Sequence, residues 1–126
     1  MVIFQKRSNR KSTGGRFKAL SVKRQHMTGS AAMLTKLGER RVKETRSLGG
    51  VTKQRLLSQD VANVFDPAKK AFVNARITTI LENGSNRNFA RRSIMTSRTI
   101  IETTAGTARI TNRPGQEGAI NAVLIK

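Results

Sequence analysis

The first 38 residues contain nine Lys or Arg residues and no Asp or Glu. Between these cations stand mainly Ser, Thr, Gly and other small or polar residues. Such a stretch buries too little apolar surface to offset the entropy lost on ordering it. The sequence therefore predicts a basic arm over residues 1–38 that is mobile alone and becomes ordered on its partner. Its cations are Lys6, Arg7, Arg10, Lys11, Arg16, Lys18, Lys23, Arg24 and Lys36.

The excess of positive charge continues beyond the arm. Lys and Arg number 25 and Asp and Glu number 7, so the net charge is +18, of which +13 falls in residues 1–58. A compact fold does not need this charge, because self-repulsion opposes compaction. A dense polyanion is the expected partner, with nucleic acid ahead of an anionic membrane. A chain of 126 residues holds one ordinary domain.

Several classes of protein are excluded by what the sequence lacks. It has no Cys, which removes disulfides, thiolate zinc sites and a cysteine nucleophile and suits a cytoplasmic protein. The longest apolar runs have four residues, whereas a membrane span needs about 20 and a secretory signal about 7–15. The arm has no helical apolar stripe for binding a membrane surface. With no Trp or Tyr and five Phe, aromatic stacking on bases is scarce.

Residues 39–126 show the pattern of a β body. They hold 23 of the 34 Ile, Leu, Val, Phe and Met residues, which is enough for a small core. Apolar alternation predicts a strand over 72–81, and further strand patterns lie at 41–48, 53–65, 100–104, 107–112 and 119–125. Ala105-Gly106 marks a hairpin turn. Asn86 is the cap of one short helical turn through Arg92.

We therefore expect a mainly β protein: a small antiparallel β-barrel-like body over 39–126, with a long basic extended N-terminal arm over 1–38. The alternation also predicts the core. Its expected members are Val73, Ile77, Leu81, Ile101, Ile110 and Val123.

No enzyme constellation is present. The single histidine, His26, cannot build a metal cluster and has no neighbours suited to catalysis. The seven acids form no local metal-binding motif, although the fold could still bring two of them together. Gly14-Gly15 and Gly49-Gly50 lack the Lys-Ser or Lys-Thr of a nucleotide-binding loop. We expect no cofactor, no metal and no small-molecule substrate.

Two segments are candidates for contact with nucleic acid. Thr13, Gly14, Gly15, Arg16 and Phe17 combine a tight turn with a guanidinium and a ring, and missing Cβ atoms let backbone N–H groups approach a phosphate. The alternative is plain turn chemistry. In the segment 86–92, Arg87 and Arg91 share one side of a helical turn and Arg92 follows. Guanidinium groups suit bidentate phosphate contact, and the alternative is a solvated charged turn.

At these residues the sequence resembles a known family, the "S-eight-e" family of archaeal and eukaryotic small-subunit ribosomal proteins. The length is similar to that of archaeal members, because eukaryotic members carry a large insertion. The matching pieces cover nearly the whole chain in order. They are Lys11-Ser12-Thr13-Gly14-Gly15-Arg16-Phe17, Thr35-Lys36-Leu37-Gly38-Glu39-Arg40-Arg41-Val42, Asn86-Arg87 with Ala90-Arg91-Arg92, Ile100-Ile101-Glu102-Thr103 with Gly106, and Arg113-Pro114-Gly115-Gln116-Glu117-Gly118 with Asn121-Ala122-Val123-Leu124.

The resemblance implies a structural protein of the small ribosomal subunit that binds small-subunit rRNA without catalysis and lies beside other ribosomal proteins. Arg113, in the matching tail, completes the expected RNA contacts. The arm is expected to neutralise charge between RNA helices, which proteins meet mainly through phosphate and 2′-hydroxyl groups. Two alternatives remain open: an assembly factor of the same family, which is expected to be longer, and a metal-dependent nuclease.

Overall fold

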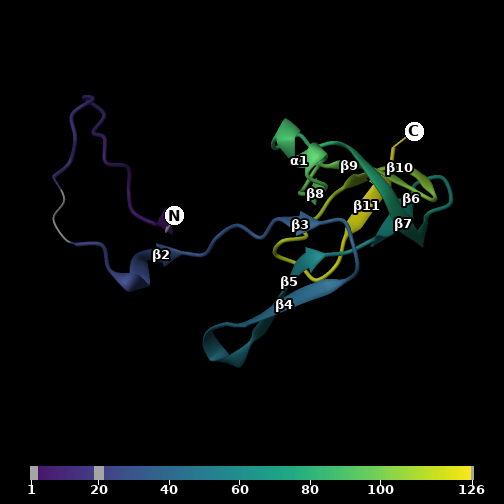
Figure 1. Ribbon diagram of the computed structural model, residues 1–126, viewed down its shortest axis with the longest axis horizontal. Helices are drawn as coiled ribbons and strands as arrows, with labels where there is room; N and C mark the ends of the chain where they lie inside the picture. Colours follow the sequence, from purple (N-terminus) through teal and green to yellow (C-terminus); the bar gives the residue numbers. More distant parts are fainter. Residues whose placement is uncertain (1–2, 19–21, 126) are drawn as a thin grey trace. The chain divides into compact units, whose positions relative to one another are not determined.

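The computed structural model describes residues 3–18 and 22–125. The chain separates into two compact units, one ending at Ala32 and the other beginning at Met33. Figure 1 shows the strands and the short helix in chain order. The larger unit carries nearly all of the secondary structure, and we describe the two units separately.

The first unit is held by a few backbone contacts. Strand β1 (Ile3–Phe4) pairs antiparallel with β2 (Thr28–Gly29), and the short 3₁₀ helix η1 (Gln25–Met27) precedes β2. None of the described residues of this unit is buried. A unit without a buried residue has no core to oppose chain entropy, so the mobility predicted for the isolated arm remains a prediction.

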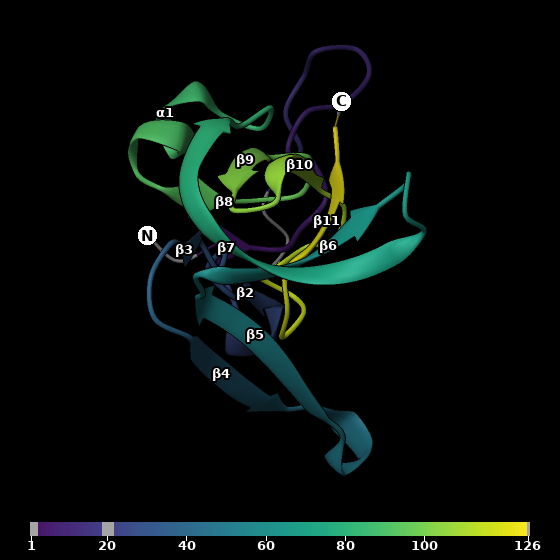
Figure 2. The same ribbon diagram turned by 90° about the vertical axis from the view of Figure 1, so that its right-hand side faces the viewer.

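The second unit contains a closed five-stranded barrel, which confirms the predicted mainly β architecture. All neighbouring strands run antiparallel except β11 and β6, which are parallel and close the barrel. Figure 2 shows the barrel strands wrapped around one another. The order around the barrel is β10 (Gly106–Ile110), β11 (Asn121–Leu124), β6 (Val61–Asp66), β7 (Ala71–Glu82) and β9 (Ile100–Thr103).

The barrel core confirms part of the predicted set. Ile77, Ile101 and Ile110 are buried, and Val123 is half-buried. The predictions for Val73 and Leu81 are wrong, because their side chains are 44% and 53% exposed. The other large side chains of this core are Leu56, Val64, Met95 and Ile120.

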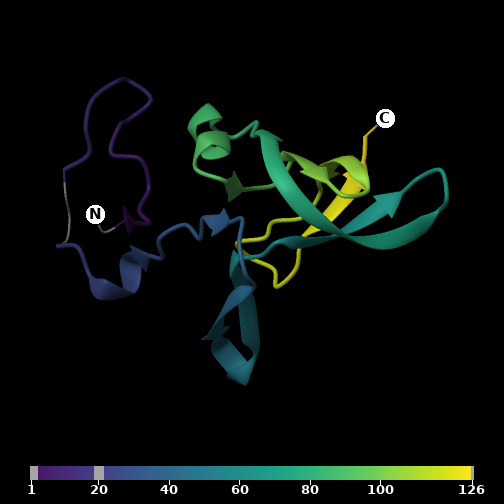
Figure 3. The same cartoon turned by 45° about the vertical axis from the view of Figure 1, so that its right-hand side comes forward.

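Both corrections have a physical reason in the geometry of β7. The register between β7 and β9 shifts between Ile77 and Thr79 and again before Glu82. Each such bulge adds a residue to one strand, so the inward face changes from odd to even positions. Ile80 therefore packs against the core in place of Leu81. Val73 lies near the turn of the β6–β7 hairpin, which extends past the other barrel strands (Figure 3).

A second sheet adjoins the barrel. Its strand order is β4 (Arg41–Arg46), β5 (Thr52–Ser58), β3 (Thr35–Lys36) and β8 (Ile94–Met95), with the 3₁₀ turn η2 (Leu48–Gly50) between β4 and β5. The sequence pattern did not indicate β3 or β8. The hydroxyl of Thr35, which is fully buried, donates a hydrogen bond to the carbonyl oxygen of Leu56 over 2.8 Å. Residues around β3 therefore share hydrogen bonds with the body, although they lie within the predicted arm.

The predicted helical turn is present as α1 (Arg87–Arg91). The side-chain oxygen of Asn86 accepts a hydrogen bond from the backbone N–H of Asn88 over 2.9 Å. This is the expected capping interaction for the first unpaired N–H groups of a helix. The turn contacts β7 and β8, so its arginines are presented by a fixed part of the body.

Candidate nucleic-acid interface

Every residue predicted to contact nucleic acid has an exposed side chain or backbone. One salt bridge joins described residues, between Arg76 Nε and Asp60 Oδ2 at 3.5 Å. Lys6 aside, the predicted cations are therefore not neutralised by a carboxylate within the described chain. They comprise Arg7, Arg10, Lys11, Arg16, Lys18, Lys23, Arg24, Lys36, Arg87, Arg91, Arg92 and Arg113.

The predicted turn in the arm is formed. The N–H of Lys11 donates to the carbonyl of Gly15 over 2.8 Å, and the N–H of Gly14 donates to the carbonyl of Lys11 over 3.1 Å. Gly14 has a φ of 85°, which an L side chain rarely adopts, so the turn itself accounts for this glycine. Gly15 has no such conformation. A Cβ there would meet only Thr13 Oγ1 at 3.8 Å and Lys11 Cδ at 3.9 Å.

The two glycines therefore differ in their reason for being there. Gly14 fits the structural interpretation, since its backbone conformation favours glycine. A Cβ at Gly15 would make only ordinary van der Waals contacts, so nothing within the described protein requires a glycine there. Gly15 has a role if a partner molecule approaches the backbone there more closely than a Cβ would allow.

The arm also carries cations stacked on its rings. The guanidinium of Arg7 lies 3.9 Å from the centroid of Phe17, and the Lys11 ammonium lies 5.4 Å from the same ring. The Lys23 ammonium lies 5.1 Å from the Phe4 ring. The guanidinium on the Phe17 ring thus comes from Arg7 and not from the neighbouring Arg16. These contacts gather cations from separate parts of the arm beside two rings, of which Phe17 is exposed and Phe4 half-buried.

On the body, α1 presents the predicted arginines outward. Arg87, Arg91 and Arg92 are all exposed. Arg91 and Arg92, with Asn88, line a surface hollow of about 330 Å³. Guanidinium groups on a fixed element lose little further freedom when they bind an anion. The arrangement suits contact with phosphate.

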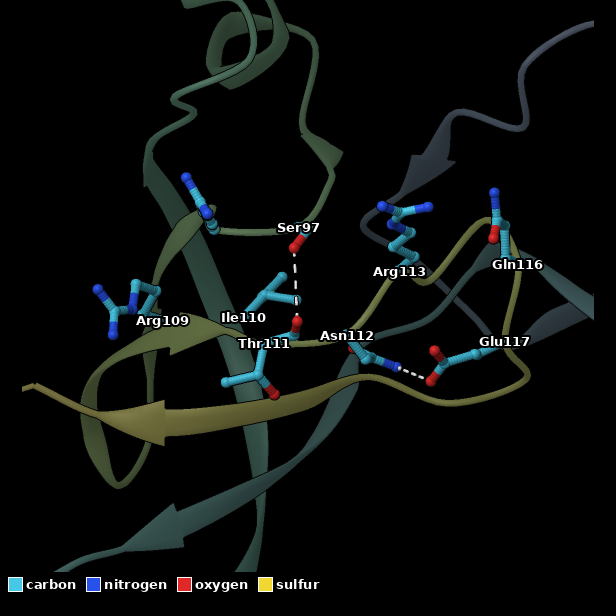
Figure 4. A pocket seen from close by; sticks show the side chains of 9 residues that line it. Ser97, Arg109, Ile110, Thr111, Asn112, Arg113, Gln116 and Glu117 are labelled. Atoms are coloured by element: carbon cyan, nitrogen blue, oxygen red, sulfur yellow. Dashed lines mark hydrogen bonds between the residues drawn. The ribbon is translucent and has the colours of Figure 1, made fainter.

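Arg113 lies at a second and larger hollow, of about 830 Å³ (Figure 4). Arg98 and Arg109 line the same hollow, and sequence reasoning missed both. The one acid there, Glu117, accepts a hydrogen bond from the side chain of Asn112 over 2.8 Å. Three exposed arginines therefore line one concave surface, with a single carboxylate among them.

The sequence offered only a weak signal for these two arginines. Arg109 stands between the buried residues Ala108 and Ile110 in β10, so strand alternation alone points it outward. Arg98 lies in a turn and has a φ of 66°, an uncommon backbone conformation for a side chain of this size. Its N–H donates to the carbonyl of Ile110 over 2.9 Å, which holds the turn against β10. Nothing local to Arg98 in the sequence indicates that contact.

Within the described ranges, no group of three or more His, Asp and Glu side chains is placed to hold a metal ion. The helices described there are also too short or too polar to cross a membrane. The geometry that stands out is a set of exposed cations on turns and short elements. Its natural ligand is a polyanion with regularly spaced charge.

Comparison with known proteins gives a consistent match. Residues 4–125 match the family described as "Ribosomal protein S8e". The chain is 44% identical over 125 residues to small ribosomal subunit protein eS8 of Picrophilus torridus, covering 99% of this chain and 100% of that protein. It is 49% identical over 121 residues to the protein of the same name from Halorubrum lacusprofundi, covering 96% and 97%. The Nanoarchaeum equitans protein of that name is 43% identical over 123 residues, covering 98% and 97%.

Proposed function

The chain belongs to the ribosomal protein S8e family, and on that premise we propose that it is a structural constituent of the small ribosomal subunit that binds small-subunit rRNA. The family is named for a ribosomal protein, which implies a non-enzymatic role in the ribosome. Partners are rRNA and neighbouring proteins of the subunit, and the location is on cytoplasmic ribosomes. The relatives match along nearly their full length, which favours a ribosomal protein over a longer assembly factor.

The mechanism is neutralisation of phosphate charge by two parts of the chain. The arm supplies nine cations, some of them stacked on the rings of Phe4 and Phe17, and these cations enter gaps between RNA helices that otherwise repel. The body supplies Arg87 and Arg91 from α1, Arg92 directly after it, and Arg113 from the second hollow. RNA duplexes present phosphate and 2′-hydroxyl groups at their surface, and Lys and Arg side chains can donate hydrogen bonds to both.

One observation supports this proposal above the others: the sequence carries a net charge of +18, far more than its own seven acids can offset. The described chain forms a single internal salt bridge. Charge that is not used for internal pairing destabilises the isolated fold through self-repulsion. It becomes favourable only when counterions are released from a polyanion.

The proposal is tested on purified small subunits. A structural constituent stays bound to the small subunit after a high-salt wash and is present in translating ribosomes. An assembly factor is recovered from precursor particles and is absent from mature subunits. A nuclease cleaves rRNA in the presence of Mg²⁺ and not in EDTA. Either of the last two results overturns the proposal.

A further inference from the structure

We propose that the two-stranded ribbon formed by β4 and β5 is a further RNA-binding element, whose one basic face lies along a phosphate backbone. The ribbon projects beyond the barrel and ends at the η2 turn (Figure 2). β5 meets β3 only at Ser58, paired with Lys36, so residues 52–56 have β4 as their one partner in the described sheet. The inference rests on the proposed function, because it names a site for the same RNA.

The register between the two strands places like charges opposite each other. Lys43 pairs with Arg55 directly across the ribbon, and Thr45 pairs with Lys53. Side chains of directly opposed residues share one face, and their Cβ atoms lie about 4.5–5.5 Å apart, with diagonal neighbours at about 7–8 Å. Lys43, Lys53 and Arg55 therefore crowd three positive charges onto one face within about one Debye length at physiological salt.

No acid on the ribbon relieves this crowding. The one carboxylate of β4 and β5, Glu44, points to the opposite face and accepts a hydrogen bond from the Gln54 amide over 3.1 Å. Lys43 and Lys53 are exposed and Arg55 is half-buried. None of the three takes part in the one salt bridge among described residues. Like charges in direct opposition destabilise a strand pair, so the free protein gains nothing from this arrangement.

The opposite face of the ribbon has a structural explanation. Val42 pairs with the buried Leu56 on that face and packs against the barrel core. Gln54 lies close to Gly118, where a Cβ would meet its Oε1 at 2.7 Å. The body therefore covers this face at Val42 and Leu56. Farther along the same face, Arg46 is exposed beside the acid Glu44, whereas the other face presents Lys43 and Lys53 to solvent without an acid. A regularly spaced row of anions bound along this face would offset the repulsion between the three cations, and the phosphates of an RNA backbone form such a row.

A competing interpretation is that these cations only keep an open strand edge from pairing with another chain, a common role for charged edges. The two interpretations predict different outcomes. Edge protection predicts self-association when the charges are removed and no change in RNA binding. RNA contact predicts weaker RNA binding from a protein that folds as well as before.

The test compares Lys43→Ser and Lys43→Glu with Arg46→Ser and Arg46→Glu, which change a cation on the opposite face of the same strand. Each full-length protein is melted and then titrated with transcribed archaeal small-subunit rRNA at several salt concentrations. Lys43→Glu places a carboxylate opposite Arg55, so its melting temperature should equal or exceed that of the wild type. Its RNA affinity should fall, and the log–log salt slope should become shallower by about 0.7–0.9, because one phosphate is no longer neutralised.

The triple variant Lys43→Ser, Lys53→Ser, Arg55→Ser should reduce the salt slope by about two units or more. The Arg46 variants should bind with the wild-type slope. The ribbon inference is overturned if the Lys43 variants bind RNA as tightly as the wild type. It is also overturned if these variants lose both thermal stability and RNA affinity, because the cation is then structural. Weak, salt-independent binding by the wild type would instead overturn the proposed function and the ribbon inference with it. If the binding of the wild type depends steeply on salt and the ribbon variants bind in the same way, only the ribbon inference is overturned.

Discussion

The Arg7 guanidinium lies over the Phe17 ring, with its Cζ 3.9 Å from the ring centroid. These residues stand on the two sides of the arm turn, and the N–H of Phe17 donates to the carbonyl of Asn9 over 2.9 Å. The contact therefore fastens the turn that carries Gly14 and Gly15. Exposed cation–π pairs contribute about 0.5–1 kcal/mol, which is enough to shift the population of a small turn.

We expect Phe17→Leu to loosen this turn without affecting the body. Amide chemical shifts of Lys11 and Gly15 should move toward unstructured values, since their mutual hydrogen bond depends on the turn. The melting temperature of the body should stay unchanged, and rRNA affinity should fall. Phe72→Leu, on an exposed ring of the body, is the control. Unmoved amide shifts would show that the cation–π contact does not hold the turn.

The two arm glycines should respond differently to substitution. Gly14→Val places a β-branched side chain at a φ of 85° and should disrupt the turn in the free protein. At Gly15 a Cβ makes only ordinary van der Waals contacts, both with flexible side chains, so in Gly15→Val the turn should persist while rRNA binding weakens. NMR of the free protein and filter binding with rRNA separate the two effects. If Gly15→Val binds normally, no close approach to RNA occurs there.

Arg91→Ala combined with Arg92→Ala should weaken rRNA binding and make the salt slope shallower by about one for each phosphate that is no longer bound. Both side chains are exposed, so the melting temperature should not fall. Arg76→Ala, which removes the partner of Asp60, is a control outside the predicted interface. Normal binding with early melting would mean that the two arginines are structural.

Ile77→Ala and Leu81→Ala test the bulge in β7. Ile77 is 4% exposed, and cutting a buried Ile to Ala costs roughly 2–5 kcal/mol, a large part of the stability of a small domain. Leu81 is 53% exposed, and its truncation should cost about 1 kcal/mol or less. The melting temperature of the Ile77→Ala variant should therefore lie at least about 4 °C below that of the Leu81→Ala variant, on the usual scale of about 4–8 °C per kcal/mol for a domain of this size. Equal melting temperatures would contradict the shifted register.

NMR of the free protein should separate the arm from the body. Residues 3–18 and 22–32 include no buried side chain, so we expect narrow, poorly dispersed amides there, apart from those of the partly populated local turn between Lys11 and Gly15. Thr35 and Lys36 pair with β5 and β8 and should give dispersed amides that exchange slowly. Slow exchange throughout residues 3–18 would contradict the predicted mobility of the arm.

The local parts of the fold were predictable from the sequence. Alternation and turn residues predicted the β9–β10 hairpin around Ala105-Gly106, and Asn86 predicted the start of α1. The parallel pairing of β11 with β6 was not predictable, because it joins residues more than fifty positions apart with no turn between them to set the register. Leu81 was wrongly predicted to lie in the core, because a bulge reverses the alternation of inward and outward side chains and no residue type in the sequence indicates the bulge.

The same division holds for the candidate interface. Charge alone identified the arm and the arginines of α1, since these cations are adjacent in sequence. Arg98 and Arg109 became neighbours only through the contact between the turn at 98 and β10. The crowding of Lys43 and Arg55 depends on the strand register, which an isolated sequence does not specify.

The pairing of β11 with β6 also bears on the timing of biosynthesis. β6 lacks its parallel neighbour until Asn121–Leu124 has been translated and has left the exit tunnel. The arm leaves the tunnel about 90 residues earlier, which at cellular elongation rates is on the order of 5–20 s. For that interval the nascent chain exposes its cations while the barrel is still open. Nascent chains of this protein are therefore exposed to adventitious polyanions before their own hydrophobic core can form.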